Sequence, residues 1–301
     1  MLFKYIVFTL FIVSSLLGKS NFGAIATGST TGTYIQIGKD LSTVFKEYNS
    51  VLEVIPTKGS KSNLDALTGK NEHARAKWAI VQSDTLDYYN FLHFKSTKKD
   101  VTGLIKTILP MYSEHIHMFI KKGNEKKISF KKGSTIIVGV PSKTSGSHIT
   151  ANLLENAYGV TFSYRYINYK KAMHYLKTEK IDIYMDVISL PAKKYTNIKG
   201  ISLLQLPKNN LMNKRYIRAT FNKNNYKWLD KDVIGYKVPS VLVTNRVDKK
   251  YNQTVGVFIK VILNNYKDLI KNGHPKWKEA YRNKFLKVNN MHPVAYKILH
   301  Q

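Results

Sequence analysis

The 301-residue sequence predicts an α/β fold that is built as two lobes, each with a doubly wound sheet. Short apolar runs of strand length alternate with longer stretches of helical periodicity, which is typical of parallel strands joined by crossover helices. This alternation occurs twice along the chain, and extended segments separate the two series. About 280 residues follow the first 20, which is enough for two domains of ordinary size.

The first series forms the predicted first lobe. Apolar runs predict strands at 22–26, 52–56, 78–81 and 104–111, and helical periodicity predicts helices at 34–48 and 63–67. The second series repeats this order and forms the predicted second lobe. Its strands are expected at 135–140, 164–167 and 181–187, with helices at 146–158 and 171–178.

The chain returns to the first lobe near its C-terminus. A long helix is expected at 251–271, because its apolar residues fall on one face, and Gly273 and Pro275 end it. We therefore expect lobe 1 to contain residues 21–112 together with 238–301, and lobe 2 to contain 113–237. Two extended crossings, at 115–119 and 238–243, would form a two-strand hinge.

The first 20 residues have the layout of a secretory signal peptide. Lys4 precedes an apolar run at 5–13, and Gly18-Lys19-Ser20 is a small-x-small triplet, which predicts cleavage near Ser20. An uncleaved anchor or a buried helix is the alternative. The chain has no cysteine, which excludes disulfides, thiolate metal ligands and a lipid-modified cysteine. An untethered periplasmic protein is the expectation.

The chain is strongly basic, with 48 Lys and Arg residues against 19 Asp and Glu residues and a net charge of +29. Nucleic-acid binding is not expected, because the lysine pairs are scattered and no nucleic-acid-binding motif accompanies them. Two interpretations of the charge stay open. One is compositional drift, and the other is a positive field that concentrates an anionic ligand.

Polar loops that lead into helices follow the predicted strands. The run at 27–34 combines glycines with hydroxyls, and similar loops follow the next strands and the first strand of lobe 2. Helix N-termini, glycine backbone and hydroxyl groups suit an anion, although ordinary helix capping explains each loop equally well. The candidate ligand-binding donors are Ser29, Thr30, Thr33, Tyr34, Ser60, Gln82, Ser83, Ser142, Ser145 and Gly146.

Acidic residues near predicted strand ends are candidates for a different role. Asp84 and Asp186 would decide whether the ligand has a cationic group, since either could accept an ammonium; Glu114 is similarly placed. A helix cap or a surface charge is the alternative for each of them.

An enzyme is not expected, and neither is a cofactor. The sequence has no GxSxG elbow, and Ser145 has only the nearby His148 as a possible base. His115 and His117 lie on the same side of an extended segment and could bind zinc with His93. Two histidines on such a segment are more often ordinary polar residues than metal ligands, so no metal site is predicted. A zinc-binding receptor stays as an alternative.

Several motifs together resemble the TAXI family of solute receptors, which serve TRAP transporters. The resemblance covers essentially the whole chain after residue 20. Its motifs, in chain order, are Ala26 to Tyr34 (ATGSTTGTY), Ile37-Gly38, Gly59-Ser60, Asn63-Leu64, Val81 to Asp84 (VQSD), Val138 to Pro141 (VGVP), Ser145 to Ser147, Ile181-Asp182, Leu190-Pro191, Val238 to Asn245, and His274 to Trp277 (HPKW).

This resemblance implies a periplasmic receptor of the type II-like binding-protein fold. Such a receptor closes around a small anionic solute, such as glutamate or another dicarboxylate, and delivers it to membrane-embedded TRAP transporter subunits. The chain departs from the family pattern before Pro191 and at 222–225, in the expected wall of the second lobe. A periplasmic sensory protein that signals to a membrane partner is the alternative function.

Overall fold

The computed structural model describes residues 20–71, 74–97, 105–284, 286, 288 and 290–300. The predicted signal peptide therefore lies outside the described residues, apart from Ser20, which is the first residue of a strand. Among the described residues, no helix is both long enough and apolar enough to cross a membrane.

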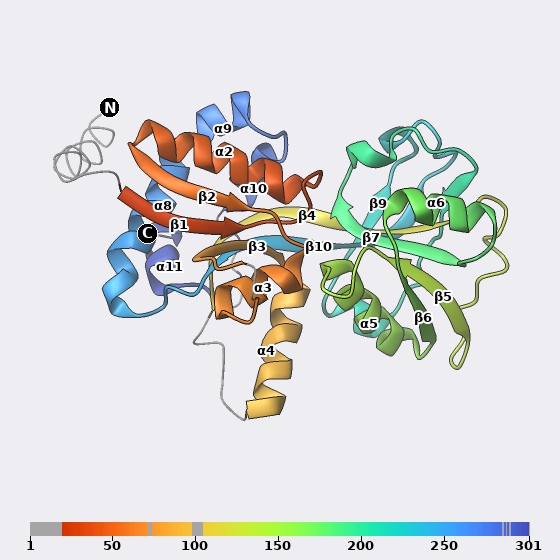
Figure 1. Ribbon diagram of the computed structural model, residues 1–301. Coiled ribbons are helices and arrows are strands. Elements are labelled where there is room, and N and C mark those ends of the chain that lie inside the picture. The colour runs from red at the N-terminus through yellow and green to blue at the C-terminus, as the bar shows by residue number, and fades with distance from the viewer. Residues whose placement is uncertain are drawn as a thin grey trace. The chain divides into compact units, whose positions relative to one another are not determined.

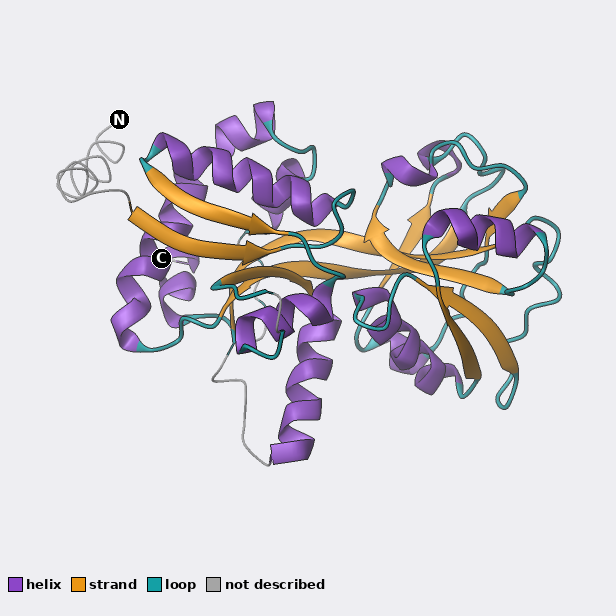
Figure 2. Cartoon of the chain, viewed as in Figure 1, coloured by secondary structure: helices purple, strands orange, loops and turns teal. Residues whose placement is uncertain are grey.

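The chain divides into two compact units, and both contain strands and helices (Figures 1 and 2). Unit 1 comprises the chain up to Val81, Tyr89–Tyr112 and residues from Ser240 on; unit 2 comprises Gln82–Tyr88 and Ser113–Pro239. Strands β4 (Lys106–Lys121) and β10 (Val233–Thr244) contain residues of both units, and so does helix α4 (Ser83–Thr97). The predicted α/β class is confirmed.

In unit 1, three strands from the N-terminal half are followed in the sheet by β10 and β4. They are β1 (Ser20–Ala26), β2 (Ser50–Ile55) and β3 (Trp78–Gln82), in the sheet order β2-β1-β3-β10-β4. Strand β1 is parallel to both β2 and β3. The helices are α2 (Thr33–Glu47), α3 (Ser60–Thr68), α8 (Asn252–Asn264), α9 (Tyr266–Asn272), α10 (Trp277–Asn283) and α11 (Pro293–His300), with a short 3-10 turn, η3 (Lys249–Tyr251).

The C-terminal helices complete the core of unit 1. Trp78 of β3 stacks on Phe258 of α8 with ring centroids 3.9 Å apart, and its indole N–H donates to the Phe22 carbonyl at 2.8 Å. The single helix predicted at 251–271 is wrong, because the structure has two helices separated by Asn265. The Asn265 amide donates to the Val261 carbonyl at 2.7 Å, and this local bond competes with continuation of the helix.

Unit 2 has a mixed sheet. Its strands are the second part of β4, β5 (Thr135–Val140), β6 (Thr161–Tyr166) and β7 (Ile183–Ser189), in the order β4-β7-β5-β6, with β8 (Ile201–Leu203) on β4 and β9 (Ile217–Phe221) on β10. Strand β5 is parallel to β6 and β7, whereas β4 is antiparallel to β7. The helices are α5 (Gly146–Tyr158), α6 (Tyr169–Lys177) and α7 (Asn210–Asn213), with 3-10 turns η1 (Lys193–Tyr195) and η2 (Lys223–Asn225).

Both faces of this sheet are buried. Along β4, Met118 and Ile120 belong to one core cluster, while Phe119 between them belongs to another. Strand β7 alternates in the same way, since Met185 packs in the first cluster and Tyr184 in the second. Because successive strand side chains point to opposite faces, this pattern predicts cover on both sides of the sheet.

Candidate functional site

The candidate residues of unit 1 lie in two loops that contact each other and in the first turns of the helices that follow these loops. These loops follow β1 and β2, which are parallel neighbours, so both loops begin at the same edge of the sheet. The Thr57 amide donates to the Gly28 carbonyl at 3.1 Å, and the Thr27 amide donates to the Ile55 carbonyl at 2.9 Å. The structure therefore brings the predicted loop at 27–34 together with the predicted loop before Ser60.

Exposure divides these candidates into two groups. Ser29 and Thr30 are exposed, whereas Thr33, Tyr34 and Ser60 are buried. Tyr34, which was predicted to supply an aromatic wall, belongs to the core of unit 1 and lies edge-on to Tyr112 at 6.3 Å.

The helices of these loops begin without a side-chain cap. The N-cap residues of α2 and α3 are Gly32 and Gly59, and neither forms a side-chain cap bond. Gly59 has a φ of 121°, a conformation that favours glycine. Hydroxyl side chains at 29 and 30 and the N-termini of two helices thus lie at this edge of the sheet.

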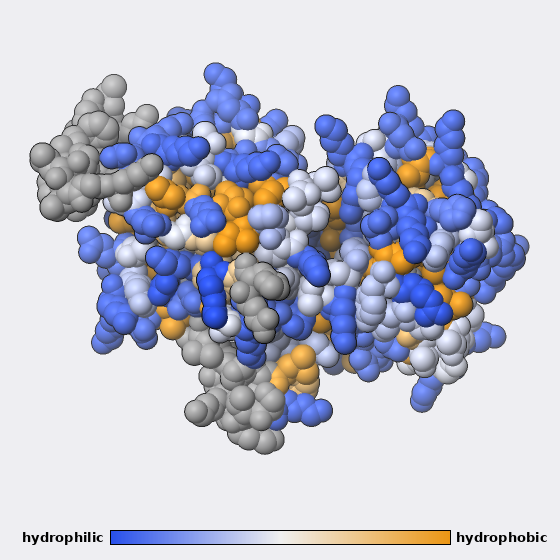
Figure 3. All heavy atoms as spheres, viewed as in Figure 1, coloured by the Kyte–Doolittle hydropathy of each residue, from blue (hydrophilic) through white to orange (hydrophobic). Residues whose placement is uncertain are grey.

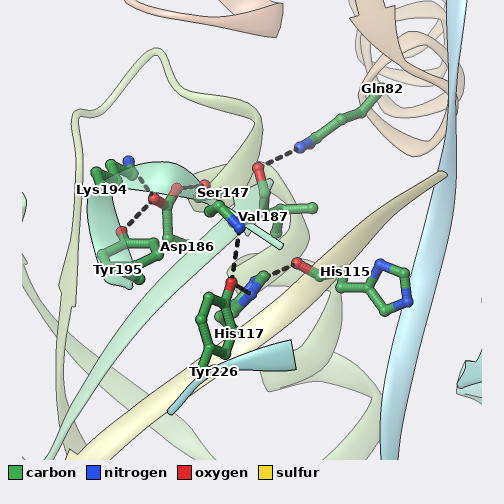
Figure 4. Close-up of polar contacts among 10 residues, drawn as sticks. Gln82, His115, His117, Ser147, Asp186, Val187, Lys194, Tyr195 and Tyr226 are labelled. Atoms are coloured by element: carbon green, nitrogen blue, oxygen red, sulfur yellow. Dashed lines mark hydrogen bonds and ion pairs between the residues drawn. The ribbon is translucent and has the colours of Figure 1, made fainter. Parts of the chain in front are cut away.

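The candidate residues of unit 2 also lie at adjacent strand ends. Strands β5 and β7 are parallel neighbours. The Ser147 hydroxyl, in the first turn of α5, donates to Asp186 at 3.0 Å and accepts the Val187 amide at 2.9 Å. The Gln82 side chain donates to the Val187 carbonyl at 3.3 Å (Figure 4). Gln82 and Asp186 therefore belong to one group of contacts; Gly146 precedes Ser147 at the start of α5, and Ser83 begins α4 immediately after Gln82.

Ser145 is the N-cap of α5. Its hydroxyl accepts the His148 amide at 3.2 Å and donates to the Ser142 carbonyl at 2.7 Å. The hydroxyl of Ser145 therefore acts as an ordinary helix cap, which was the alternative to ligand binding for this residue. His148 holds the same loop a second time, because its Nδ1 lies 2.9 Å from the Lys143 carbonyl oxygen. The loop from Ser142 to Ser145 is thus fixed by internal bonds.

Asp186 is a buried carboxylate that is surrounded by donors (Figure 4). Lys194 lies 2.6 Å from its Oδ2 and Tyr195 donates to the same oxygen at 2.5 Å, while Ser147 bonds Oδ1. Burial raises the pKa of Asp186, but the Lys194 charge and the hydrogen bonds outweigh it, so the pKa is lowered overall. The ionised carboxylate already has a cation partner.

Asp84 is equally buried but has no cation partner among its hydrogen-bond donors. It accepts the Thr85 amide at 2.7 Å, the Thr150 hydroxyl at 2.6 Å and the Tyr216 hydroxyl at 2.8 Å. Burial raises its pKa more than these bonds lower it. Both candidate carboxylates are therefore occupied by internal donors, and Lys194, Tyr195, Thr150 and Tyr216 are partners that the sequence did not reveal.

His117 uses both ring nitrogens inside unit 2 (Figure 4). Its Nδ1 lies 2.9 Å from the His115 carbonyl, which can only accept, so Nδ1 carries the proton and Nε2 accepts the Tyr226 hydroxyl at 2.8 Å. Burial lowers the pKa of His117 to about 4. The described residues contain no group of three His, Cys, Asp or Glu residues that could hold a metal, and the His93 side chain lies outside them.

Solved structures share this fold. The chain is similar to a periplasmic transporter, at 14% identity over 88% of this chain and 87% of that one, with a TM-score of 0.53. It is also similar to YhfZ from Shigella flexneri, at 10% identity over 88% and 96%, with a TM-score of 0.51. A TctC solute-binding protein from Polaromonas aligns at 13% identity over 88% of each chain, with a TM-score of 0.46.

The predicted receptor-type α/β fold is confirmed by the matches above a TM-score of 0.5. No curated protein matches the chain. The model of the NMT1-like family matches residues 25–300, and the chain therefore belongs to the NMT1-like family.

Proposed function

We propose that the chain is an extracytoplasmic solute receptor of the TAXI group. It captures a small carboxylate or an acidic amino acid by closure of its two lobes and delivers it to a TRAP-type membrane transporter. Support comes from membership of the NMT1-like family and from a fold shared with a periplasmic transporter. The observation with the greatest weight is that polar loops at the ends of parallel strands lead into helices in both units.

The chemistry of these loops favours an anionic ligand. They contain hydroxyl and backbone N–H groups, whereas Asp84 and Asp186 are buried and satisfied by other residues of unit 2. An ammonium on the ligand would need another acceptor, so a dicarboxylate fits the proposal better than a basic amino acid. The net charge of +29 acts in the same direction, because it raises the local concentration of anions.

The proposed ligand contacts follow from this chemistry. Ser29 and Thr30 are exposed hydroxyls beside the start of α2, and Gly146 begins α5. The hydroxyls of Ser145 and Ser147 instead hold the loop in place. The remaining proposed contacts are Thr33, Tyr34, Ser60, Gln82, Ser83 and Ser142, whereas Asp84 and Asp186 keep their internal donors and are not proposed to bind the ligand.

A thermal-shift screen of the exported chain against succinate, glutarate, glutamate and arginine tests the proposal. A ligand that binds only the folded state raises Tm by mass action, and we expect the dicarboxylates and glutamate to do so but not arginine. Thr30→Ala should weaken the best ligand about ten- to a hundredfold, the equivalent of one hydrogen bond to a charged group. Thr161→Ala, at an exposed position of β6, is the matched control. No shift with any acid would refute the proposal.

A further inference from the structure

Unit 2 has a concave surface that none of the proposed ligand contacts lines. A pocket of about 380 Å³ lies between α6 and the segment that leads into β8. Three lysines line it, Lys170, Lys177 and Lys199, together with the apolar side chains of Tyr169, Met173 and Ile198. One wall belongs to the connection between β7 and β8, but none of the lining residues is a proposed ligand contact.

The two walls of the pocket come from different parts of the chain. Lys170, Met173 and Lys177 are three and four residues apart on α6, so they share one face of the helix. Lys199 lies on the opposite wall. A Cβ placed on Gly200 would lie 3.7 Å from Cε of Lys177, so the stem of this lysine runs along the backbone of the second wall.

The charge of the pocket is uncompensated. No ion pair involves Lys170, Lys177 or Lys199 within the part of the chain that the structure describes. No acidic side chain lines the pocket. Nearby carboxylates are used elsewhere: Glu179 pairs with Lys121 at 2.5 Å, and Asp186 pairs with Lys194. Three like charges around one concavity repel each other and attract an anion.

The floor of the pocket is apolar and firmly supported. Met173 is a buried member of the core cluster that includes Tyr195 and Phe221, and Tyr169 and Ile198 pack against that cluster. Figure 3 shows hydrophobic atoms among hydrophilic ones on the part of this face where Figure 1 places α6. A ligand that matches both the three lysines and the apolar floor has carboxylates on either side of an apolar group.

We propose that this pocket docks an acidic segment of a partner protein, with an apolar side chain on the floor and carboxylates at the three lysines. A flat anionic bilayer would reach the ammonium groups but would leave the concave floor unfilled. An inorganic anion would do the same. The proposal goes beyond solute capture, because the docking pocket shares no residue with the proposed ligand contacts.

The probe is a fluorescein-labelled peptide with a central leucine flanked by two glutamates on each side, and its binding to the exported chain is followed by fluorescence anisotropy. The test variant is Lys170→Gln/Lys177→Gln/Lys199→Gln. The matched control is Lys260→Gln/Lys267→Gln/Lys278→Gln, which removes three exposed lysines from helices of unit 1. We expect at least a tenfold loss of affinity in the first variant and less than a threefold loss in the second.

Three results would overturn the proposal. Equal losses in both triple variants would mean that net charge alone attracts the peptide. Equal binding of a peptide with serine in place of leucine would mean that the floor plays no part. Binding to phosphatidylglycerol vesicles that depends on the same three lysines, without peptide binding, would identify a membrane surface instead. Thermal shifts with dicarboxylates should be unchanged in the test variant, so failure of docking and failure of solute capture are distinguishable.

Discussion

Lys194→Met tests whether the buried Asp186 carboxylate depends on its cation. The two side chains are 6% and 21% exposed and their charged atoms lie 2.6 Å apart. Removing one member of a buried ion pair costs about 3–5 kcal/mol, because it leaves an uncompensated charge. The bonds from Tyr195 and Ser147 remain in the variant, so we expect the lower end, about 3 kcal/mol. This corresponds to roughly a hundredfold change in the unfolding equilibrium.

The pH dependence of this loss identifies its cause. In the wild type the pKa of Asp186 is lowered, so its contribution to stability is present above the unfolded pKa and is lost as pH falls through the folded pKa. Without Lys194, burial dominates and raises the pKa, so the penalty is greatest at neutral pH and disappears once the carboxyl is protonated. The difference in stability between wild type and variant should therefore shrink as pH falls from 7 toward 3.

Urea denaturation followed by tryptophan fluorescence measures this difference at each pH. Lys193→Met is the matched control, because it removes the same charge from the neighbouring exposed position. A loss of equal size in both variants, or one that does not change with pH, would refute the ion-pair reasoning and indicate a packing or net-charge effect.

Two further predictions concern other parts of the core. His117 has a folded pKa of about 4, below its usual 6.5, so the unfolded state binds more protons between these values and stability falls as pH drops from 6.5 to 4. Between pH 6.5 and 4 this loss of stability amounts to about 3 kcal/mol. His117→Gln should remove it and flatten the pH–stability curve in this range, and an unchanged slope would contradict the lowered pKa of His117. Gly38→Ala should lower Tm, at a cost of about 1–3 kcal/mol, because the added Cβ would lie 2.8 Å from Cγ2 of Thr27. Gly256→Ala, whose nearest contact would be 3.4 Å, should not lower Tm, and equal effects of the two changes would rule out crowding as the cause.

Much of the fold was predictable because strand and helix periods are local properties. The strand predicted at 135–140 is β5, and the strand at 22–26 lies within β1. Only the start of helix α4, after the strand at 78–81, was predicted, and its extent was not, since Phe91 and Phe94 are exposed and its apolar residues do not form one face. Strand β9 was also not predicted, because its five residues are too few to show a clear alternation of apolar and polar side chains.

The site was predictable only in part, for a different physical reason. Polar loops after strands can be read from the order of residues, and the structure brings neighbouring loops together within each unit. The partners of the carboxylates cannot be read in this way. Asp84 is bonded by Tyr216, which is 132 residues away, and no spacing rule connects them. Whether an acidic residue is free for a ligand thus depends on tertiary contacts.

The discontinuous core of unit 1 has a consequence for the order in which the chain acquires structure. Phe22, Trp78 and Phe258 pack together, so the N-terminal strands cannot complete this core until the segment around Phe258 has been synthesised. Unit 2 needs only Gln82–Tyr88 and Ser113–Pro239, all of which precede that segment. During synthesis from the N-terminus, all of unit 2 is therefore present before the core of unit 1 can be completed by α8.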